Sequence, residues 1–201
     1  ALLLAYGKRL HPGKLETVAV RTAAMGYAVP GMVIAVGVLI PFAWFDNQLD
    51  ALMRQHFGIS TGLLLSGSIA ALVFAYVVRF LSVSLQSVES GLGRIRPSLD
   101  ESARSLGCSP GGVLGRVHLP LLRGSVLAAL LLVFVDVLKE LPATLILRPF
   151  NFNTLAVRTY ELASDERLAD AATPALAIVL IGLLPVILLA RGHKEVQASA
   201  G

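Results

Sequence analysis

Long stretches without a charged residue dominate this chain. Residues 171–190 form a run of 20 residues that contains no Asp, Glu, Lys or Arg, and residues 23–45 form another of 23. An α-helix rises about 1.5 Å per residue, so each run is long enough to cross a hydrocarbon core about 30 Å thick. Only 15% of the residues are charged, against about 25% in ordinary soluble domains. We therefore expect an all-α integral membrane protein, a multi-span helical bundle.

Two further stretches complete the predicted set of spans. Residues 58–78 carry no charge, and Arg79 follows them, so its side chain is expected to reach the membrane interface. Residues 124–135 are also uncharged, but this run is long enough to cross a membrane only together with the apolar residues on either side. We predict a single transmembrane domain over residues 1–201, with spans at about 23–45, 58–80, 119–138 and 171–190. The pair Pro30-Gly31 is expected to kink the first span.

The first residues of the chain read ALLLAYGKRL. They lack the charged start, the apolar core and the cleavage site of a signal peptide. We expect them to be the end of a membrane helix, and the chain to be the C-terminal portion of a longer protein.

The distribution of Lys and Arg predicts the orientation of the spans. If four spans alternate, five basic residues fall on one side: Arg54, Lys139, Arg148, Arg158 and Arg167. The other twelve fall on the opposite side, before the first span, in the central loop and in the tail that contains Arg191 and Lys194. Because an excess of Lys and Arg marks the cytoplasmic side, the loop at residues 86–123 and the C-terminus are predicted to be cytoplasmic. Residues 139–170 are then predicted to form an external loop.

The central loop carries signals for two short helices. Ser98 and Glu101 have the spacing of a capping box, which predicts a helix from Leu99 to about residue 106. Gly107 is suited to a positive φ at the end of that helix. Ser109 is the predicted N-cap of a second helix, with Pro110 at its first position. By themselves these signals indicate only a pair of capped helices in a basic loop.

The same loop resembles a motif of a known family. It reads Glu101-Ser102-Ala103, three residues, Gly107, nine residues, and then VHLP. This pattern is similar to the EAA loop of bacterial ABC-importer permeases, E-A-A, three residues, G, nine residues, I-x-L-P. Ser102 replaces an Ala of the motif and Val117 replaces its Ile.

The resemblance implies a role for this loop. In the family it is the coupling helix that fits into a cleft of the cytoplasmic ATPase, so the expected coupling residues are Glu101, Ser102, Ala103, Gly107, Leu119 and Pro120. The chain has no phosphate-binding GxxxxGK[ST] loop. We expect it to bind no cofactor and to be no enzyme, with ATP used by the partner ATPase. The other expected partners are a periplasmic substrate-binding protein, a second permease half, fused or separate, and membrane lipid. We expect no nucleic-acid partner.

The external segment resembles one branch of these permeases. It contains ELPAT at residues 140–144 and NTLAVRTYELASD at residues 153–165, which are similar to motifs of the ferric-iron branch. The resemblance implies iron(III) transport across the bacterial inner membrane. Residues 154–163 have a helix-like pattern that includes Arg158 and Glu161, and we expect this surface to receive the binding protein. A solvated connector is the alternative interpretation of the same residues.

Two acidic residues near the third span are candidates for the substrate path. Asp136 and Glu140 are four residues apart, which would place them on one helix face, and carboxylates suit Fe(III). The alternative is an ion pair of Lys139 with one of them at the outer interface. The four histidines have no shared spacing, and Cys108 is the single cysteine, so we assign no metal site.

Three functions are compatible with a chain of this kind. The first is the permease. The second is a membrane enzyme, against which no Ser/His, Cys/His, paired-carboxylate or HExxH arrangement lies within a span. The third is a scaffold without transport, which would leave the EAA-like loop unexplained. Composition and spacing do not choose among iron(III), thiamine, polyamine and phosphonate as the substrate of a permease.

Overall fold

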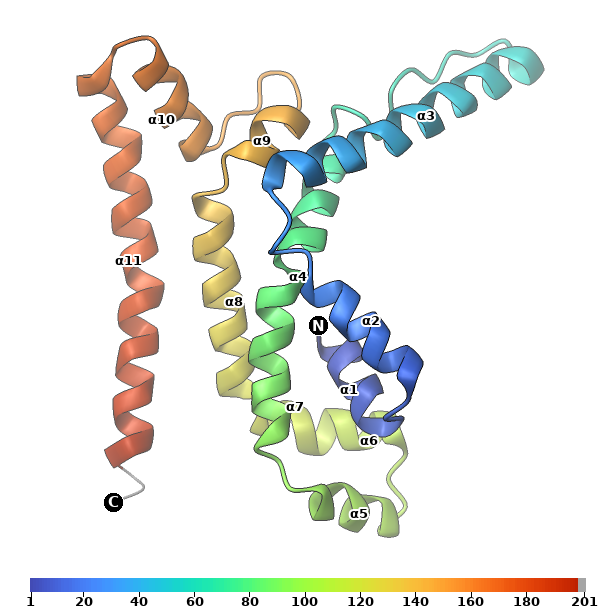
Figure 1. The fold of residues 1–201 in the computed structure, drawn as a ribbon, viewed down its shortest axis with the longest axis vertical. Helices are drawn as coiled ribbons and strands as arrows, with labels where there is room; N and C mark the ends of the chain where they lie inside the picture. Colours follow the sequence, from blue (N-terminus) through green and yellow to red (C-terminus); the bar gives the residue numbers. More distant parts are fainter. Residues whose placement is uncertain (199–201) are drawn as a thin grey trace. The chain divides into compact units, whose positions relative to one another are not determined.

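The computed structural model describes the backbone of residues 1–198 and the side chains of these residues except 188, 189 and 191–198. Arg191 and Lys194, which contribute to the predicted orientation, lie outside the described side chains. Every regular element in the described part of the chain is helical (Figure 1), which confirms the predicted fold class. The elements are α1 (Leu2–Leu10), α2 (Lys14–Ala24), α3 (Gly31–Phe57), α4 (Ile69–Gly93), α5 (Pro97–Ser105), α6 (Pro110–Val113), the π-helical turn η1 (Leu114–His118), α7 (Leu119–Leu121), α8 (Arg123–Leu138), α9 (Pro142–Leu147), α10 (Leu155–Ser164) and α11 (Leu168–Ala198).

The first of two compact units combines residues 1–27 with residues 80–134. Its core consists of seven buried apolar side chains, namely Ala5, Val20, Leu85, Val88, Leu92, Ile95 and Leu122. On α4, Leu85, Val88 and Leu92 recur at helical spacing and therefore share one face. Gly91 allows close approach there, because a Cβ atom at this position would collide with the side chains of Leu122 and Ser125.

The second compact unit combines residues 28–79 with the chain from residue 135 onward. Its core is formed by α3, α4 and α9, which contribute Ile34, Ala35, Val38, Ala71, Leu72, Ala75, Ala143 and Leu147. Four of these eight residues are alanines, so the backbones of the three helices can approach one another closely. Helix α10 packs against α11 in the same unit.

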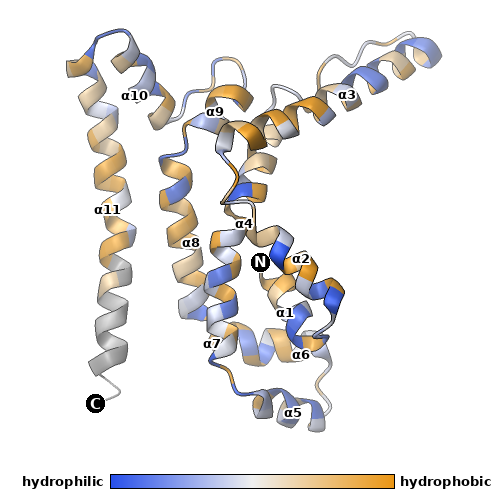
Figure 2. Ribbon diagram, viewed as in Figure 1, coloured by the Kyte–Doolittle hydropathy of each residue, from blue (hydrophilic) through white to orange (hydrophobic). Residues whose placement is uncertain are grey.

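Three helices are long and apolar enough to cross a membrane, within the described residues: α3, α4 and residues Leu168–Ile187 of α11. A fourth span results only if residues Pro110–Leu121 and α8, which are bent by 75° at Leu122, are counted together. Figure 2 shows the hydrophobic residues that cover much of α8 and α11. The predicted spans at about 23–45, 58–80 and 171–190 overlap α3, α4 and α11, and the one at 119–138 overlaps α7 and α8.

The first predicted span is interrupted. The run at residues 23–45 contains the end of α2 at Ala24 and a break before α3 begins at Gly31. Pro30 has an extended backbone (φ −55°, ψ 139°) and precedes α3, so it separates two helices and does not kink one. At its other end α3 continues to Phe57, past the charged residue Asp46, which is buried and accepts backbone N–H groups from Leu65 and Ser66 at 2.7–3.1 Å.

The second predicted span begins later than expected. Residues 58–68 lie outside any helix, and Gly58, Gly62 and Gly67 have positive φ values of 62–71°. A left-handed backbone at three glycines ends helical structure without any charged residue, so the charge-free run did not reveal it. Because α4 extends from Ile69 to Gly93, Arg79 lies inside the helix and not at its end. The predicted position of Arg79 near the end of a helix is therefore wrong, and its position at the membrane interface stays a prediction.

Candidate functional site

Helix α5 is the first helix of the EAA-like loop. It begins at Pro97, in the first helical position, after Arg96 in an extended conformation, as the residue before a proline favours. Ser98 therefore lies inside the helix and makes no cap, and the capping box predicted for Ser98 and Glu101 is wrong. The helix therefore begins two residues before Leu99, the position at which a Ser98 cap would start it.

Gly107 ends α5 as predicted. Its φ is +83°. The N–H of Cys108 donates to the Ala103 carbonyl at 3.0 Å, and the N–H of Gly107 donates to that of Arg104 at 2.9 Å. This pair of bonds is the Schellman arrangement, which satisfies carbonyls at the end of a helix. An ideal Cβ at Gly107 would meet no atom within 4 Å, so the backbone conformation alone requires glycine here.

The second helix of the loop is short and held by its surroundings. The hydroxyl of Ser109 accepts the N–H of Gly112 at 3.2 Å, which confirms the predicted N-cap. Val113 is buried, whereas the two glycines give the helix little stability of its own. The chain then passes through the π-helical turn η1 to Leu119 and Pro120, where the proline has no N–H to continue an α-helical ladder.

The predicted coupling residues divide into an exposed set and one buried residue. Glu101, Ser102, Gly107, Leu119 and Pro120 are exposed, and Ala103 is buried. Leu106, at the end of α5, has 85% of its surface exposed. Leu119 and Pro120 also line a groove of about 440 Å³, together with Arg123 and apolar residues of α8. The loop thus exposes a carboxylate on α5 and a large apolar side chain directly after this helix.

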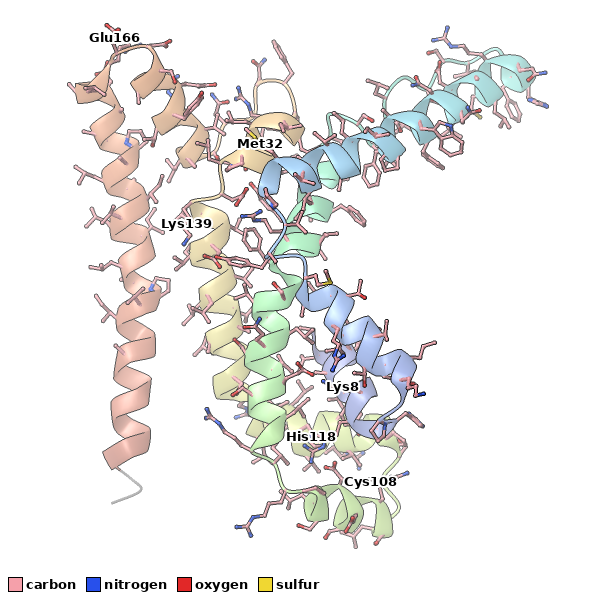
Figure 3. The ribbon with its side chains drawn as sticks, in the orientation of Figure 1. Lys8, Met32, Cys108, His118, Lys139 and Glu166 are labelled. Carbon is pink, nitrogen blue, oxygen red and sulfur yellow. The ribbon has the colours of Figure 1, made fainter. Side chains whose placement is uncertain are left out.

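A polar cluster that the sequence patterns did not predict joins Asp100 of α5 to His118 and Arg9. His118 is fully buried, and its Nε2 lies 2.8 Å from Oδ1 of Asp100. The other carboxylate oxygen of Asp100 is 2.8 Å from Nε of Arg9. Burial lowers the pKa of His118, more than the nearby Asp100 raises it, so the neutral imidazole is favoured. No sequence signal joins these residues, because they come from three separate segments; Figure 3 labels His118.

A second polar cluster lies in the other compact unit. Glu140 is 6% exposed, and its Oε2 is 3.2 Å from Nε of Arg79 on α4. Its Oε1 accepts the N–H of Ala143 at 3.1 Å, at the start of α9. Arg79 also donates to the carbonyl of Val29, two residues before α3, at 3.0 Å. The hydroxyls of Tyr76 and Thr144 are hydrogen-bonded in the same unit.

Asp136 and Glu140 do not share a helix face. Helix α8 ends at Leu138, and Glu140 lies in the turn between α8 and α9. Asp136 pairs with Lys139, with 3.0 Å between Oδ1 and Nζ. The ion pair considered as the alternative is therefore present. No group of three or more His, Cys, Asp or Glu side chains that could hold a metal ion occurs among the described residues.

The candidate residues for docking of the binding protein lie on α10, which begins at Leu155 with Thr154 as its cap and ends at Ser164, close to the predicted helix. Arg158 has 52% of its side chain exposed and lies 3.7 Å from Glu161. Glu161 also contacts two residues of the preceding turn, Arg148 at 2.9 Å and Asn153 at 3.1 Å. Arg158 is thus a surface cation, whereas Glu161 also holds the turn in place.

Comparison with known proteins shows the family of the chain. The family model described as "Binding-protein-dependent transport system inner membrane component" matches residues 1–195. The chain is 30% identical over 163 residues to the Fe(3+)-transport system permease protein FbpB 2 of Haemophilus influenzae, covering 81% of this chain and 29% of that protein. It is 29% identical over 168 residues to PhnV of Salmonella typhimurium, described as a 2-aminoethylphosphonate transport system permease protein, covering 84% and 57%.

These matches extend along most of the described chain, although the chain spans less than two thirds of the length of each relative. The helical membrane-type fold and the EAA-like loop agree with the family match. This chain belongs to the family of inner membrane components of binding-protein-dependent transport systems.

Proposed function

We propose that this chain is the permease subunit, or part of it, of an ABC importer that passes iron(III) from a periplasmic binding protein to the cytoplasm. The observation that carries the proposal is the exposed loop from Glu101 to Gly107, held by a Schellman turn, in a chain of the binding-protein-dependent family. ATP hydrolysis belongs to a separate ATPase, and the second permease half is fused or a separate chain.

The geometry of α5 suits docking into another protein. Helix α5 exposes Glu101, Leu106 directly after the helix is largely exposed, and Ala103 is buried. A carboxylate beside an apolar anchor is a combination that a cleft with a basic rim would bind. In the proposal this helix is the coupling helix, and movement of the ATPase reaches the membrane helices through it.

Iron(III) is the proposed substrate for two reasons. The ELPAT and NTLAVRTYELASD motifs resemble the ferric-iron branch, and FbpB 2 is described as a permease of an Fe(3+)-transport system. Asp136 and Glu140 stay as candidates for the substrate path. Because Glu140 is already paired with Arg79, it would contact a passing substrate only if that pair opened.

A second candidate substrate is 2-aminoethylphosphonate. PhnV is matched over 57% of its length at nearly the same identity as FbpB 2. The phosphonate group is an anion that would pair with the guanidinium of Arg79, and the ammonium group of the same molecule would pair with the carboxylate of Glu140. Contact with Arg79 is therefore expected for 2-aminoethylphosphonate and not for the iron(III) cation.

Uptake measurements in a strain that lacks this transporter test the substrate. Radiolabelled iron(III), 2-aminoethylphosphonate, thiamine and a polyamine are offered separately to the deletion strain and to the complemented strain. The proposal predicts that only iron uptake depends on the transporter. Normal iron uptake in a deletion strain that has lost phosphonate uptake would refute the iron assignment and leave the permease assignment standing.

The external helix α10 is the proposed surface for the binding protein. Surface charges tune the rate of encounter more than the final affinity, so Arg158→Glu should slow uptake and change its salt dependence. Glu161→Lys should have the same effect and should also loosen the turn that Arg148 and Asn153 form. Unchanged uptake rates for both variants at low and high salt would remove α10 from the docking surface.

A further inference from the structure

We propose that α1 is a brace for the coupling loop, and that Arg9 and Asp100 are positioning residues that set the orientation of α5 toward the ATPase. The inference rests on the proposed role of α5. It goes further because it assigns a function to the N-terminal helix, which carries no part of the EAA-like motif. All of the contacts that support it lie within the first compact unit.

The guanidinium of Arg9 joins three segments of the chain. Its Nε donates to Oδ2 of Asp100 on α5 at 2.8 Å. Its Nη1 and Nη2 donate to the carbonyls of Leu92 and Ile95 at 2.5 and 2.9 Å, at the end of α4. The end of a helix leaves carbonyls without partners and carries partial negative charge, so a forked cation suits it. One side chain therefore fixes α5 with respect to α4.

Asp100 also contacts the second half of the loop. Its Oδ1 lies 2.8 Å from Nε2 of the buried His118, in the turn that follows α6. The hydroxyl of Tyr6, on α1, donates to the carbonyl of Pro110 at 2.8 Å. The ring of Tyr6 lies 5.2 Å from that of His118. Helix α1 thus contacts the loop on both sides of Gly107.

The contacts of Arg9 and Asp100 are shielded from solvent, which increases the stability that they contribute. The side chains of Arg9 and Asp100 are 17% and 19% exposed, and Ala5 and Tyr6, on the same helix as Arg9, are buried. Hydrogen bonds to charged groups contribute more than neutral ones, and they contribute most where water is excluded. We infer that displacement of α5 against α1 is costly, so the loop and α1 respond together to a movement of the ATPase.

The neighbouring residue Lys8 provides a matched control. It pairs with Glu89 at 2.7 Å, but the two side chains are 37% and 32% exposed. Exposed ion pairs contribute little to stability. Lys8 and Arg9 are therefore adjacent cations on one helix, of which only Arg9 contacts α5; Figure 3 labels Lys8.

The test uses the complete transporter with Arg9→Lys, Asp100→Asn or Lys8→Gln. Arg9→Lys keeps the charge but loses the fork, and Asp100→Asn keeps the shape but loses the charge. The affinity of permease-containing membranes for the ATPase and the uptake per ATP hydrolysed are both measured per permease molecule, so that a lower permease level does not enter the result. We expect the first two variants to lose about tenfold in affinity or coupling, and Lys8→Gln to stay within about twofold of the wild type.

A fourth variant, Gly107→Val, separates the brace from the coupling loop itself. If it releases the ATPase while Arg9→Lys and Asp100→Asn keep wild-type affinity and coupling, the brace is refuted and the coupling loop stands. If none of these variants, Gly107→Val included, changes affinity or coupling, the proposed role of α5 fails as well. An equal loss in Lys8→Gln and Arg9→Lys would also refute the brace, because it would show a general effect of charge on α1.

Discussion

Arg79 and Glu140 form an ion pair in which Nε lies 3.2 Å from Oε2, with 17% and 7% of the two side chains exposed. The pair connects Val29, two residues before α3, with the middle of α4 and the start of α9, through the carbonyl of Val29 and the N–H of Ala143. The two residues lie far apart in the sequence. Their contact therefore depends on the assembled fold and contributes to holding it.

Loss of one partner of this pair should destabilise the protein more than loss of both. Glu140→Gln keeps an oxygen for the N–H of Ala143 but leaves Arg79 without its carboxylate, and removing one partner of a buried pair costs about 3–5 kcal/mol. The double variant Arg79→Met with Glu140→Gln should lose less, because no buried charge is left. Unfolding of the purified protein in detergent measures the free energies. A double variant less stable than either single variant would contradict the prediction.

Gly31, the first residue of α3, should tolerate no side chain. A Cβ there would lie 2.7 Å from Oε1 of Glu140 and 3.0 Å from Nη1 of Arg79. Gly31→Ala should push the pair apart and destabilise the protein by about 1–3 kcal/mol. Gly37→Ala, in the same helix with nothing within 4 Å, is the control and should stabilise the helix by up to about 1 kcal/mol. Thermal unfolding of both variants measures these changes. A Gly31→Ala variant as stable as Gly37→Ala would contradict the prediction, because it would show that the Arg79–Glu140 pair can shift to make room for the methyl group.

Local signals predicted the local structure. The left-handed turn at Gly107, the cap at Ser109 and the extent of α10 follow from residues within a few positions of one another. The predicted cap at Ser98 was wrong because two local signals compete there, and the proline before it decides the start of the helix. The helices begin and end at other residues than the apolar runs where glycines and Pro30 interrupt these runs, because hydropathy does not report backbone conformation.

Sequence patterns did not predict the contacts between charged residues that are far apart in the chain. Arg79 was expected at the interface and Glu140 on the face of Asp136, but each contacts the other. His118 was assigned no ligand role, and nothing near it in the sequence points to Asp100 or to Arg9. When the fold brings charged residues from distant segments together, their spacing in the sequence follows no pattern from which the contact could be predicted.

Gly107→Val should release the ATPase from membranes without preventing insertion of the permease. Valine at φ +83° is strained by about 1 kcal/mol or more, which should disturb the Schellman turn. Gly111→Val is the control, because Gly111 lies in α6, has no positive φ, and has no atom within 4 Å of its ideal Cβ. Immunoblots of washed membranes measure both subunits. Full retention of the ATPase and full uptake in Gly107→Val would contradict the role of the loop.

Cysteine labelling tests the predicted topology. In a Cys108→Ser background, Ser164→Cys and Ser98→Cys place a thiol at two exposed serines, on α10 and α5 respectively. An impermeant reagent added to intact spheroplasts should label the first, and the second only after the membrane is broken. The reverse pattern would overturn the orientation that the distribution of Lys and Arg predicts.

ATP hydrolysis by the reconstituted transporter tests the central claim most directly. The full-length permease that contains this chain is placed in proteoliposomes with its ATPase, and hydrolysis is measured with and without the iron(III)-loaded binding protein. The account predicts that hydrolysis rises only when permease, ATPase and loaded binding protein are all present, and that Gly107→Val abolishes the rise. Hydrolysis at the same rate without the permease, or a rise that Gly107→Val leaves intact, would contradict it.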